Sequence, residues 1–201
     1  MSAAGGTRER LLDAARQLIE EGGYGTASVI AIAERAGLAA GTLYRHFGSK
    51  QELFVEVFRS VCDREVRAMQ AAARAVPVEA THVERLQTVF VTFAERALRR
   101  RRLAWALLAE PVDPLVDAER LAYRERYAAL VATVLRAAIA AKELPDQDVE
   151  LTAAALVGGC GEALVGPLSP VGARVGADEL LFALTTFVRR AAGAAEPAGV
   201  R

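Results

Sequence analysis

Residues 41–50, near the start of the chain, carry side chains that suit contact with a nucleic acid. Gly41 lacks a side chain, so a helical turn there can approach a sugar-phosphate backbone, and Thr42 can donate to a phosphate or meet a thymine methyl. Tyr44 offers a phenol that reaches a phosphate and a ring that can lie against a base edge. Lys50 stands near a helix N-terminus, where its charge and free backbone amides can act on one phosphate. The chemistry predicted here is binding of a polyanion.

Residues that could support catalysis or bind a metal are few and scattered. The two cysteines, Cys62 and Cys160, are far apart, and the two histidines, His46 and His82, fall in separate elements. The chain contains no H-E-x-x-H, G-x-S-x-G or phosphate-binding glycine loop. We therefore expect no enzyme activity, no metal site and no cofactor, and we interpret Cys160 as a small packed residue rather than a redox sensor.

Composition allows a large folded core but does not announce a partner. The 201 residues are 53% hydrophobic, and 25 basic side chains balance 25 acidic ones. No secretion signal is visible beside Arg8, Glu9 and Arg10, and two distant cysteines fit a reducing cytoplasm. The most apolar segment, Thr152 to Leu168, is interrupted by Glu162 and is shorter than the ~20 residues of a spanning helix. We interpret it as a buried helix and expect no membrane association.

The pattern of apolar residues predicts an all-α fold, because no segment shows strand-like alternation or a hairpin dipeptide. The first three helices are short and crowded into the first fifty residues: Thr7 to Glu21, Ser28 to Ala36, and Ala40 to His46. Later starts are marked by capping boxes or an N-cap with a first-turn proline, and the last two helices are separated by glycine and proline. These later signals are Ser49 to Glu52, Thr81 to Glu84, Asp113-Pro114, and helices over about Gln147 to Val165 and Ala177 to Ala192.

Two short helices joined at Gly37 have the geometry of a helix-turn-helix, which can set a helix into a DNA major groove. Thr7 to Phe58 closely resembles the N-terminal DNA-binding domain of the TetR family of transcriptional regulators. A dozen positions agree in order and without gaps, at Gly23-Tyr24, Ile32-Ala33, Ala36-Gly37-Leu38, Gly41-Thr42-Leu43-Tyr44-Arg45-His46-Phe47 and Ser49-Lys50-Gln51-Glu52-Leu53.

The resemblance implies the fold, the division into domains and the DNA contacts. It implies a three-helix DNA-binding domain over residues 5–65, with its helix-turn-helix at about 28–47. A larger helical ligand-binding and dimerisation domain follows over 66–193, then a disordered tail over 194–201, with about nine helices in total. The residues that it assigns to DNA are Ser28, Ala40, Gly41, Thr42, Tyr44, Arg45, His46 and Lys50.

Three positions depart from the family pattern. Ala39 stands where the family usually has a serine or threonine N-cap for the recognition helix, and loss of such a cap costs about 1 kcal/mol of helix stability. Ile30 replaces a common basic phosphate contact, and Ala31 replaces the acidic capping-box partner of Ser28. These departures predict weaker DNA affinity, or a weaker salt dependence of that affinity, than is usual in the family.

The second half of the chain is expected to hold a ligand cavity and a dimer interface. Aromatic residues could line the cavity or simply fill the core, and these are Phe90, Phe93, Trp105, Tyr123 and Tyr127. Family members usually dimerise through their last two helices, where small residues permit close approach. The residues assigned to that interface are Leu156, Gly159, Cys160, Leu164, Leu181 and Leu184.

The strongest charge cluster is Arg96 with the run Arg99 to Arg102. We interpret it as a solvated helix face. Contact with phosphate or an acidic ligand, and an ion-pair link to the DNA-binding domain, remain open.

Taken with the resemblance, these features imply a homodimeric transcriptional regulator, most simply a repressor, that binds a palindromic double-stranded operator and is released by an unknown small molecule. A helical adaptor that binds only protein is an alternative, although it does not explain Gly41 to Lys50. A helical enzyme is the weaker alternative.

Overall fold

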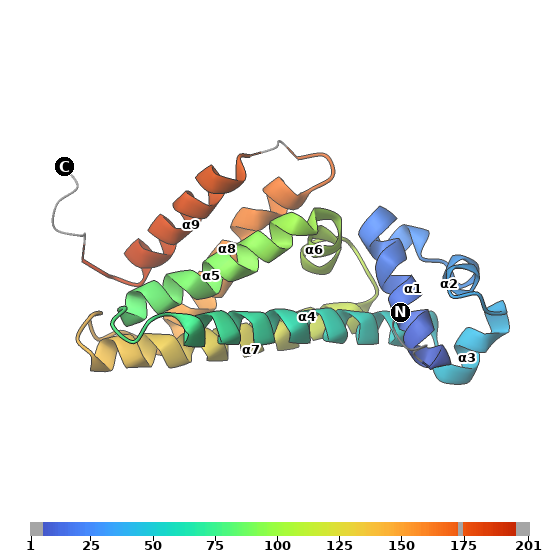
Figure 1. Cartoon of the computed structure of the whole chain (residues 1–201), viewed down its shortest axis with the longest axis horizontal. Helices are drawn as coiled ribbons and strands as arrows, with labels where there is room; N and C mark the ends of the chain where they lie inside the picture. The colour runs from blue at the N-terminus through green and yellow to red at the C-terminus, as the bar shows by residue number, and fades with distance from the viewer. Residues whose placement is uncertain (1–5, 173–174, 196–201) are drawn as a thin grey trace.

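The computed structural model describes residues 6–172 and 175–195, and within these ranges the chain is helical and contains no strand. Figure 1 shows α1, α2 and α3 at one end of an elongated molecule, with α4 and α7 running side by side along it. The helices are α1 (Thr7–Gly22), η1 (Tyr24–Thr26), α2 (Val29–Arg35), η2 (Ala40–Thr42), α3 (Leu43–His46), α4 (Lys50–Ala75), α5 (His82–Arg99), α6 (Arg101–Leu108), α7 (Pro114–Ala140), α8 (Val149–Leu168) and α9 (Ala177–Ala191). The predicted all-α class with about nine helices is confirmed.

Helix starts follow the capping residues that the sequence marks. The Thr81 hydroxyl accepts from the Glu84 amide, and the Glu84 carboxylate accepts from the Thr81 amide, so the predicted capping box is present. At α4 only half of the predicted box forms. The Ser49 hydroxyl accepts from the Glu52 amide, but the Glu52 carboxylate accepts from the amide of Gly48 at 2.9 Å. The glutamate thus reaches one residue further back.

The ends of α7 and α8 differ from the ends that the sequence pattern predicts, and the pattern does not predict α6 as a separate helix. The pattern does not separate α6 from α5, although the backbone breaks between them at Arg100, with φ −128° and ψ 54°. Helix α7 ends at Ala140, before Leu144-Pro145, and Lys142 adopts a left-handed conformation with φ 59°. Helix α8 continues past Gly166 to Leu168, although Pro167 falls in its last turn.

Helix α4 connects two hydrophobic cores. Its N-terminal half packs with α1, α2 and α3 through Leu53, Phe54 and Val57, and this core also takes in residues of α6 and α7. Met69, near the C-terminal end of α4, belongs to the second core, which is built mainly from α5, α7, α8 and α9. The proposed domain division at 65/66 falls within α4, which crosses it without a break. Of the proposed tail, residues 196–201 lie outside the described residues.

Helix α8 is buried on one face only. Ala153, Leu156, Cys160, Leu164 and Leu168 face the second core, whereas most of the intervening residues are exposed. Among the described residues it is the one helix long and apolar enough to span a membrane by length and composition, with 28% of its most apolar window buried. A core helix of a folded protein passes the same test, and α8 packs against α7 and α9. The expected buried helix is therefore buried along one side.

Adjacent residues of α3 provide a matched stability test. Leu43 is fully buried, whereas Tyr44 is 58% exposed. Leu43→Ala should lower the free energy of unfolding by about 2–5 kcal/mol, because it leaves a cavity in the first core. Tyr44→Ala should change it by less than about 0.5 kcal/mol. Urea unfolding followed by circular dichroism measures both, and equal decreases in the two variants would contradict this placement.

Candidate nucleic-acid interface and internal cavity

The turn and helix formed by η2 and α3 present a short polar surface at the end of the molecule. Leu43 and Phe47 point inward and fix α3 on the first core, with 0% and 3% exposure. Tyr44, Arg45 and His46 lie between them in sequence and are exposed. Ala40 and Gly41 are also exposed, and a Cβ built on Gly41 would meet nothing within 4 Å, so this turn is open to an approaching partner.

Neighbouring residues frame this surface. The Ser28 hydroxyl caps α2 by accepting from the Ala31 amide at 3.1 Å. The reciprocal bond of a capping box is absent, as expected with alanine and not an acidic residue at position 31. Ala39 provides no cap for η2, and the segment begins as a 3₁₀ turn before the four α-helical residues of α3. Ile30 is 63% exposed, so an apolar side chain stands on this face. Lys50 begins α4 with its ammonium 5.2 Å from the centre of the Phe54 ring.

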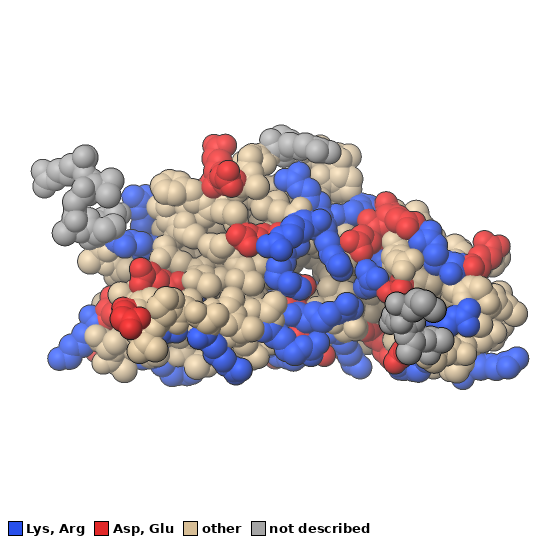
Figure 2. All heavy atoms as spheres, viewed as in Figure 1, with Lys and Arg blue, Asp and Glu red and all other residues tan. Residues whose placement is uncertain are grey.

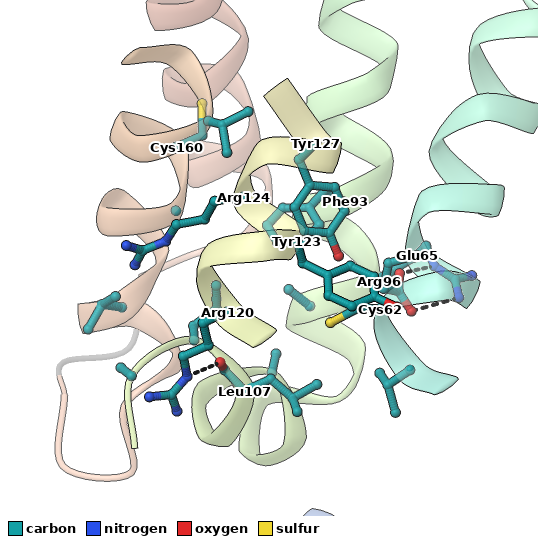
Figure 3. A pocket seen from close by; sticks show the side chains of 18 of the residues that line it. Cys62, Glu65, Phe93, Arg96, Leu107, Arg120, Tyr123, Arg124, Tyr127 and Cys160 are labelled. Carbon is teal, nitrogen blue, oxygen red and sulfur yellow. Dashed lines mark hydrogen bonds and ion pairs between the residues drawn. The ribbon is translucent and has the colours of Figure 1, made fainter. Parts of the chain in front are cut away.

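A cavity of about 330 Å³ lies between α4, α5, α6, α7 and α8 (Figure 3). Four of the five aromatic residues expected there line it, namely Phe90, Phe93, Tyr123 and Tyr127. Trp105 does not line it; its ring packs against the second core from outside, with the Arg102 guanidinium 5.0 Å from the ring centre. The expectation for Trp105 is therefore corrected. Helix α6 turns this residue away from the cavity while Leu103 and Leu107 face inward.

The thiols and phenols on the cavity wall stay neutral at physiological pH. Burial raises the pKa of both Cys62 and Cys160 to about 12. Burial also raises the pKa of Tyr127, and burial together with the hydrogen bond to Asp63 raises the pKa of Tyr123 to about 12. Cys160 is thus a packed thiol with no tendency to ionise, and the charge in the cavity comes from arginine and glutamate.

Arginines from α5 and α7 line the cavity, although the pattern of the sequence singles out only those of α5. Arg96 pairs with Glu65 of α4 through two hydrogen bonds, one of them 3.0 Å long. Arg120 donates to the last carbonyls of α6, at Ala106 and Leu107, both at 2.8 Å. Arg124 lines the same wall one turn later. Arg120 and Arg124 are four residues apart, and so are Tyr123 and Tyr127. Residues four apart share a face of a helix, so this spacing could have indicated that all four line one side of α7.

The arginine run is not a solvated helix face throughout, which corrects that interpretation. Arg99 pairs with Glu95 on its own helix at 2.9 Å, but Arg100 reaches Glu20 of α1 at 3.6 Å. Arg102 donates to the Gly22 carbonyl at the end of α1 at 2.6 Å. Figure 2 shows basic side chains gathered around a hollow near the junction of α6 with α1.

Gly23 lies at the centre of this junction. Its φ of +83° favours glycine, and a Cβ there would overlap both the Arg102 guanidinium and the Glu110 carboxylate. The next residue, Tyr24, donates its backbone N–H to Glu110 at 3.2 Å. Helix α6 and the residues after it therefore hold the end of α1 directly.

Four of the residues expected at a dimer interface are buried within the chain itself. Leu156, Cys160, Leu164 and Leu184 are at most 4% exposed and belong to the second core, so they cannot contact a second chain in this conformation. Leu181 is half-buried against the same core, and Gly159 packs under the Phe187 ring. The expected interface therefore lies on the wrong face of these helices. The large apolar side chains that α8 and α9 expose are Leu151, Phe182 and Phe187.

No group of three or more His, Cys, Asp or Glu side chains that could hold a metal ion occurs in residues 6–172 and 175–195. His46 belongs to the exposed surface of α3, and His82 begins α5.

Two family models match the chain. The model described as bacterial regulatory proteins, tetR family, matches residues 11–57, and the model described as tetracyclin repressor-like, C-terminal domain, matches residues 79–164. Between them they include the exposed surface of α3 and much of the cavity wall.

Individual proteins agree with these models. The transcriptional regulator UidR of Escherichia coli K12 is 31% identical over 105 residues, which are 52% of this chain and 51% of UidR. The repressor KstR2 of Rhodococcus jostii is 34% identical over 128 residues, 61% of this chain and 58% of KstR2. The chain thus spans about half the length of the curated relatives it matches.

Solved structures share the whole fold at low identity. The fatty acid degradation regulator FadR from Bacillus halodurans superposes with a TM-score of 0.79 at 20% identity, covering 93% of this chain and 96% of that one. FadR from Bacillus subtilis, solved in complex with stearoyl-CoA, gives 0.76 at 21% identity, covering 90% and 96%. Because consecutive models of one family match both halves of the chain and the fold agrees along its length, the chain belongs to the TetR family of transcriptional regulators.

Proposed function

We propose that this protein is a DNA-binding transcriptional repressor that acts as a homodimer and releases its operator when a small molecule enters the cavity. The observation that carries the proposal is the exposed polar surface of η2 and α3, held on a buried Leu43 and Phe47. The names of the matching relatives UidR and KstR2 support regulation, and that of KstR2 supports repression.

The proposed DNA contacts are Ser28, Ala40, Gly41, Thr42, Tyr44, Arg45, His46 and Lys50. A short helix with an open glycine turn can enter a major groove, while polar side chains on its exposed side meet bases and phosphates. The exposed Ile30 and the absence of a side-chain cap at Ala39 favour a modest affinity. Dimerisation compensates, because two recognition helices bind a palindromic operator together.

We assign the dimer interface to the outward faces of α8 and α9. Phe182 is 74% exposed, and Leu151 and Phe187 are exposed on the same two helices. Exposed apolar residues of this size support an interaction surface, and a two-fold contact through both helices would bury them. Small residues between them, such as Ala155 and Gly158 of α8, allow two helices to approach closely.

The contacts of α6 support a route from the cavity to the DNA-binding surface. Arg120 lines the cavity and also holds the C-terminal carbonyls of α6 and the Glu110 carbonyl beyond them, the last at 2.6 Å. The Glu110 carboxylate in turn accepts from Tyr24 at the end of α1. A molecule that moves Arg120 or α6 would shift α1 and the recognition helix attached to its core. Operator affinity then falls only by as much as that molecule prefers the shifted state.

The alternatives gain less support. A helical adaptor accounts for the apolar faces of α8 and α9 but not for the open glycine turn beside Tyr44. For an enzyme, the cavity offers thiols and phenols whose raised pKa values make them poor nucleophiles at neutral pH. As a regulator of DNA the protein would act in the cytoplasm.

The two lysines of the chain give a matched test of DNA binding. Lys50→Ala should lower affinity for operator DNA from the region flanking the gene. It should also reduce the slope of log affinity against log salt by about two, because the homodimeric variant neutralises two phosphates fewer, one per subunit. Lys142→Ala removes the same charge at an exposed site beyond the end of α7 and should change neither. Fluorescence anisotropy at several salt concentrations measures both, and equal weakening in the two variants would refute the site.

Tyr44→Ala tests base and phosphate contact without a change of charge. It should weaken operator binding at least tenfold while the far-ultraviolet circular dichroism and the dimer stay unchanged, because the side chain is exposed and supports no core. Unchanged affinity would remove the central residue of the proposed surface.

Phe182→Glu tests the dimer interface. Burial of an unpaired charge is costly, so a carboxylate placed in this apolar contact should make the variant monomeric by light scattering at concentrations where the native protein is dimeric. Val78→Glu, at a 90% exposed loop position, is the control and should remain dimeric. A dimeric Phe182→Glu would place the interface elsewhere.

A further inference from the structure

The charged side chains on the cavity wall are unevenly distributed. The wall carries four arginines, Arg96, Arg100, Arg120 and Arg124, against two acids, Glu65 and Glu162. Arg96 is neutralised by Glu65, and Arg100 lies near Glu20. Arg120 is paired with Asp117 at 2.7 Å and otherwise bonds to backbone carbonyls.

Arg124 is the exception. It makes no hydrogen bond or ion pair with any part of the chain that the structure describes, and Glu162, the acid that α8 contributes to the wall, pairs with neither Arg120 nor Arg124. Figure 3 shows Arg124 reaching from α7 toward α8, away from the Glu65–Arg96 pair, whereas Arg120 reaches toward Leu107 of α6. At this end of the cavity the Arg124 guanidinium therefore has no partner within the described chain, and water can reach it, since Arg124 is exposed.

The rest of the wall is apolar. Phe58, Met69, Phe90 and Leu107 lie on it from three different helices, and the thiols and phenols among them are uncharged. The volume of about 330 Å³ corresponds to roughly eleven groups of the ~30 Å³ that a water molecule occupies in the liquid. An unbranched chain of about ten carbons is of this size.

We infer that the cavity binds an anionic amphiphile: a medium-length acyl chain lies among the apolar residues, and its carboxylate or phosphate head group pairs with Arg124 at the α7–α8 end. A guanidinium is suited to this role because its planar fork donates two parallel hydrogen bonds to a carboxylate or phosphate. The inference names the ligand class of the cavity in the proposed function and rests on that function for its regulatory meaning.

Calorimetric titration of the full-length protein at pH 7, without DNA, tests the inference. The probes share one chain and differ in the head group: decanoate, decanoyl-CoA, decan-1-ol and decylamine. The native protein should bind decanoate or decanoyl-CoA about tenfold more tightly than decan-1-ol, because only an anion pairs with Arg124. The stronger of the two anions identifies the source, a free acid or a thioester bearing phosphates.

Variants assign the preference to Arg124. Arg124→Gln should abolish the preference for the anion over the alcohol, and Arg124→Glu should bind decylamine in place of decanoate. Arg101→Gln, which removes an arginine that lies off the cavity wall, should keep the native preference. Thermal unfolding verifies that each variant is folded. Equal binding of decanoate and decan-1-ol by the native protein, or equal weakening in Arg124→Gln and Arg101→Gln, would overturn the inference.

Operator release separates this inference from the proposed function. Decanoate or decanoyl-CoA is added to the complex of protein and operator, and anisotropy is followed. An anion that binds in the calorimeter without releasing DNA would overturn the ligand response but leave the ligand class standing. Specific operator binding by a protein that shows no preference for the anion in the calorimeter would overturn the ligand class but leave the proposed DNA binding standing.

Discussion

The structure depends on the continuity of α4, a single helix that belongs to two hydrophobic cores. Leu53 and Phe54 near its start fix the first three helices, while Met69 near its end is buried with α5. Because a packed helix moves as a rigid rod, the segment that lines the cavity and the segment that supports α3 cannot shift independently. The same helix contributes Cys62 and Glu65 to the cavity wall.

A second connection is polar and much smaller. It consists of Arg102, Glu110 and the backbone around Gly23, where the end of α1 meets α6. Arg120 links this junction to the cavity, since its guanidinium is shared between the α6 carbonyls and Asp117. Hydrogen bonds that involve a charged group are individually strong but directional, so a small displacement is enough to weaken them. The cavity is thus joined to the end of the molecule that carries α3 by one rigid connection and one adjustable one.

The cavity combines two environments that suit different parts of one molecule. Its apolar wall favours a chain removed from water, and the α7–α8 end keeps Arg124 in reach of solvent. A fully buried cation would have to be paired within the protein, whereas one at a wet rim can remain without a partner at little cost. Charge at the rim and apolar surface inside therefore coexist without destabilising the fold.

Local sequence determined most of the helices, although not the break between α5 and α6, and it determined the surface of α3, because capping residues, glycine stops and apolar spacing act within a few residues of one another. The inward Leu43 and the outward Tyr44 followed from that spacing, whereas the absent caps at Ala39 and Ala31 followed from comparison with the family pattern. Only the tertiary structure decided which face of α8 is buried. A helix made mainly of alanine, glycine, valine and leucine is apolar on every side, so its sequence does not distinguish the face that packs from the face that stays exposed. Likewise, the role of Arg124 depends on which helices surround α7, and neighbours distant in sequence leave no local pattern to identify them.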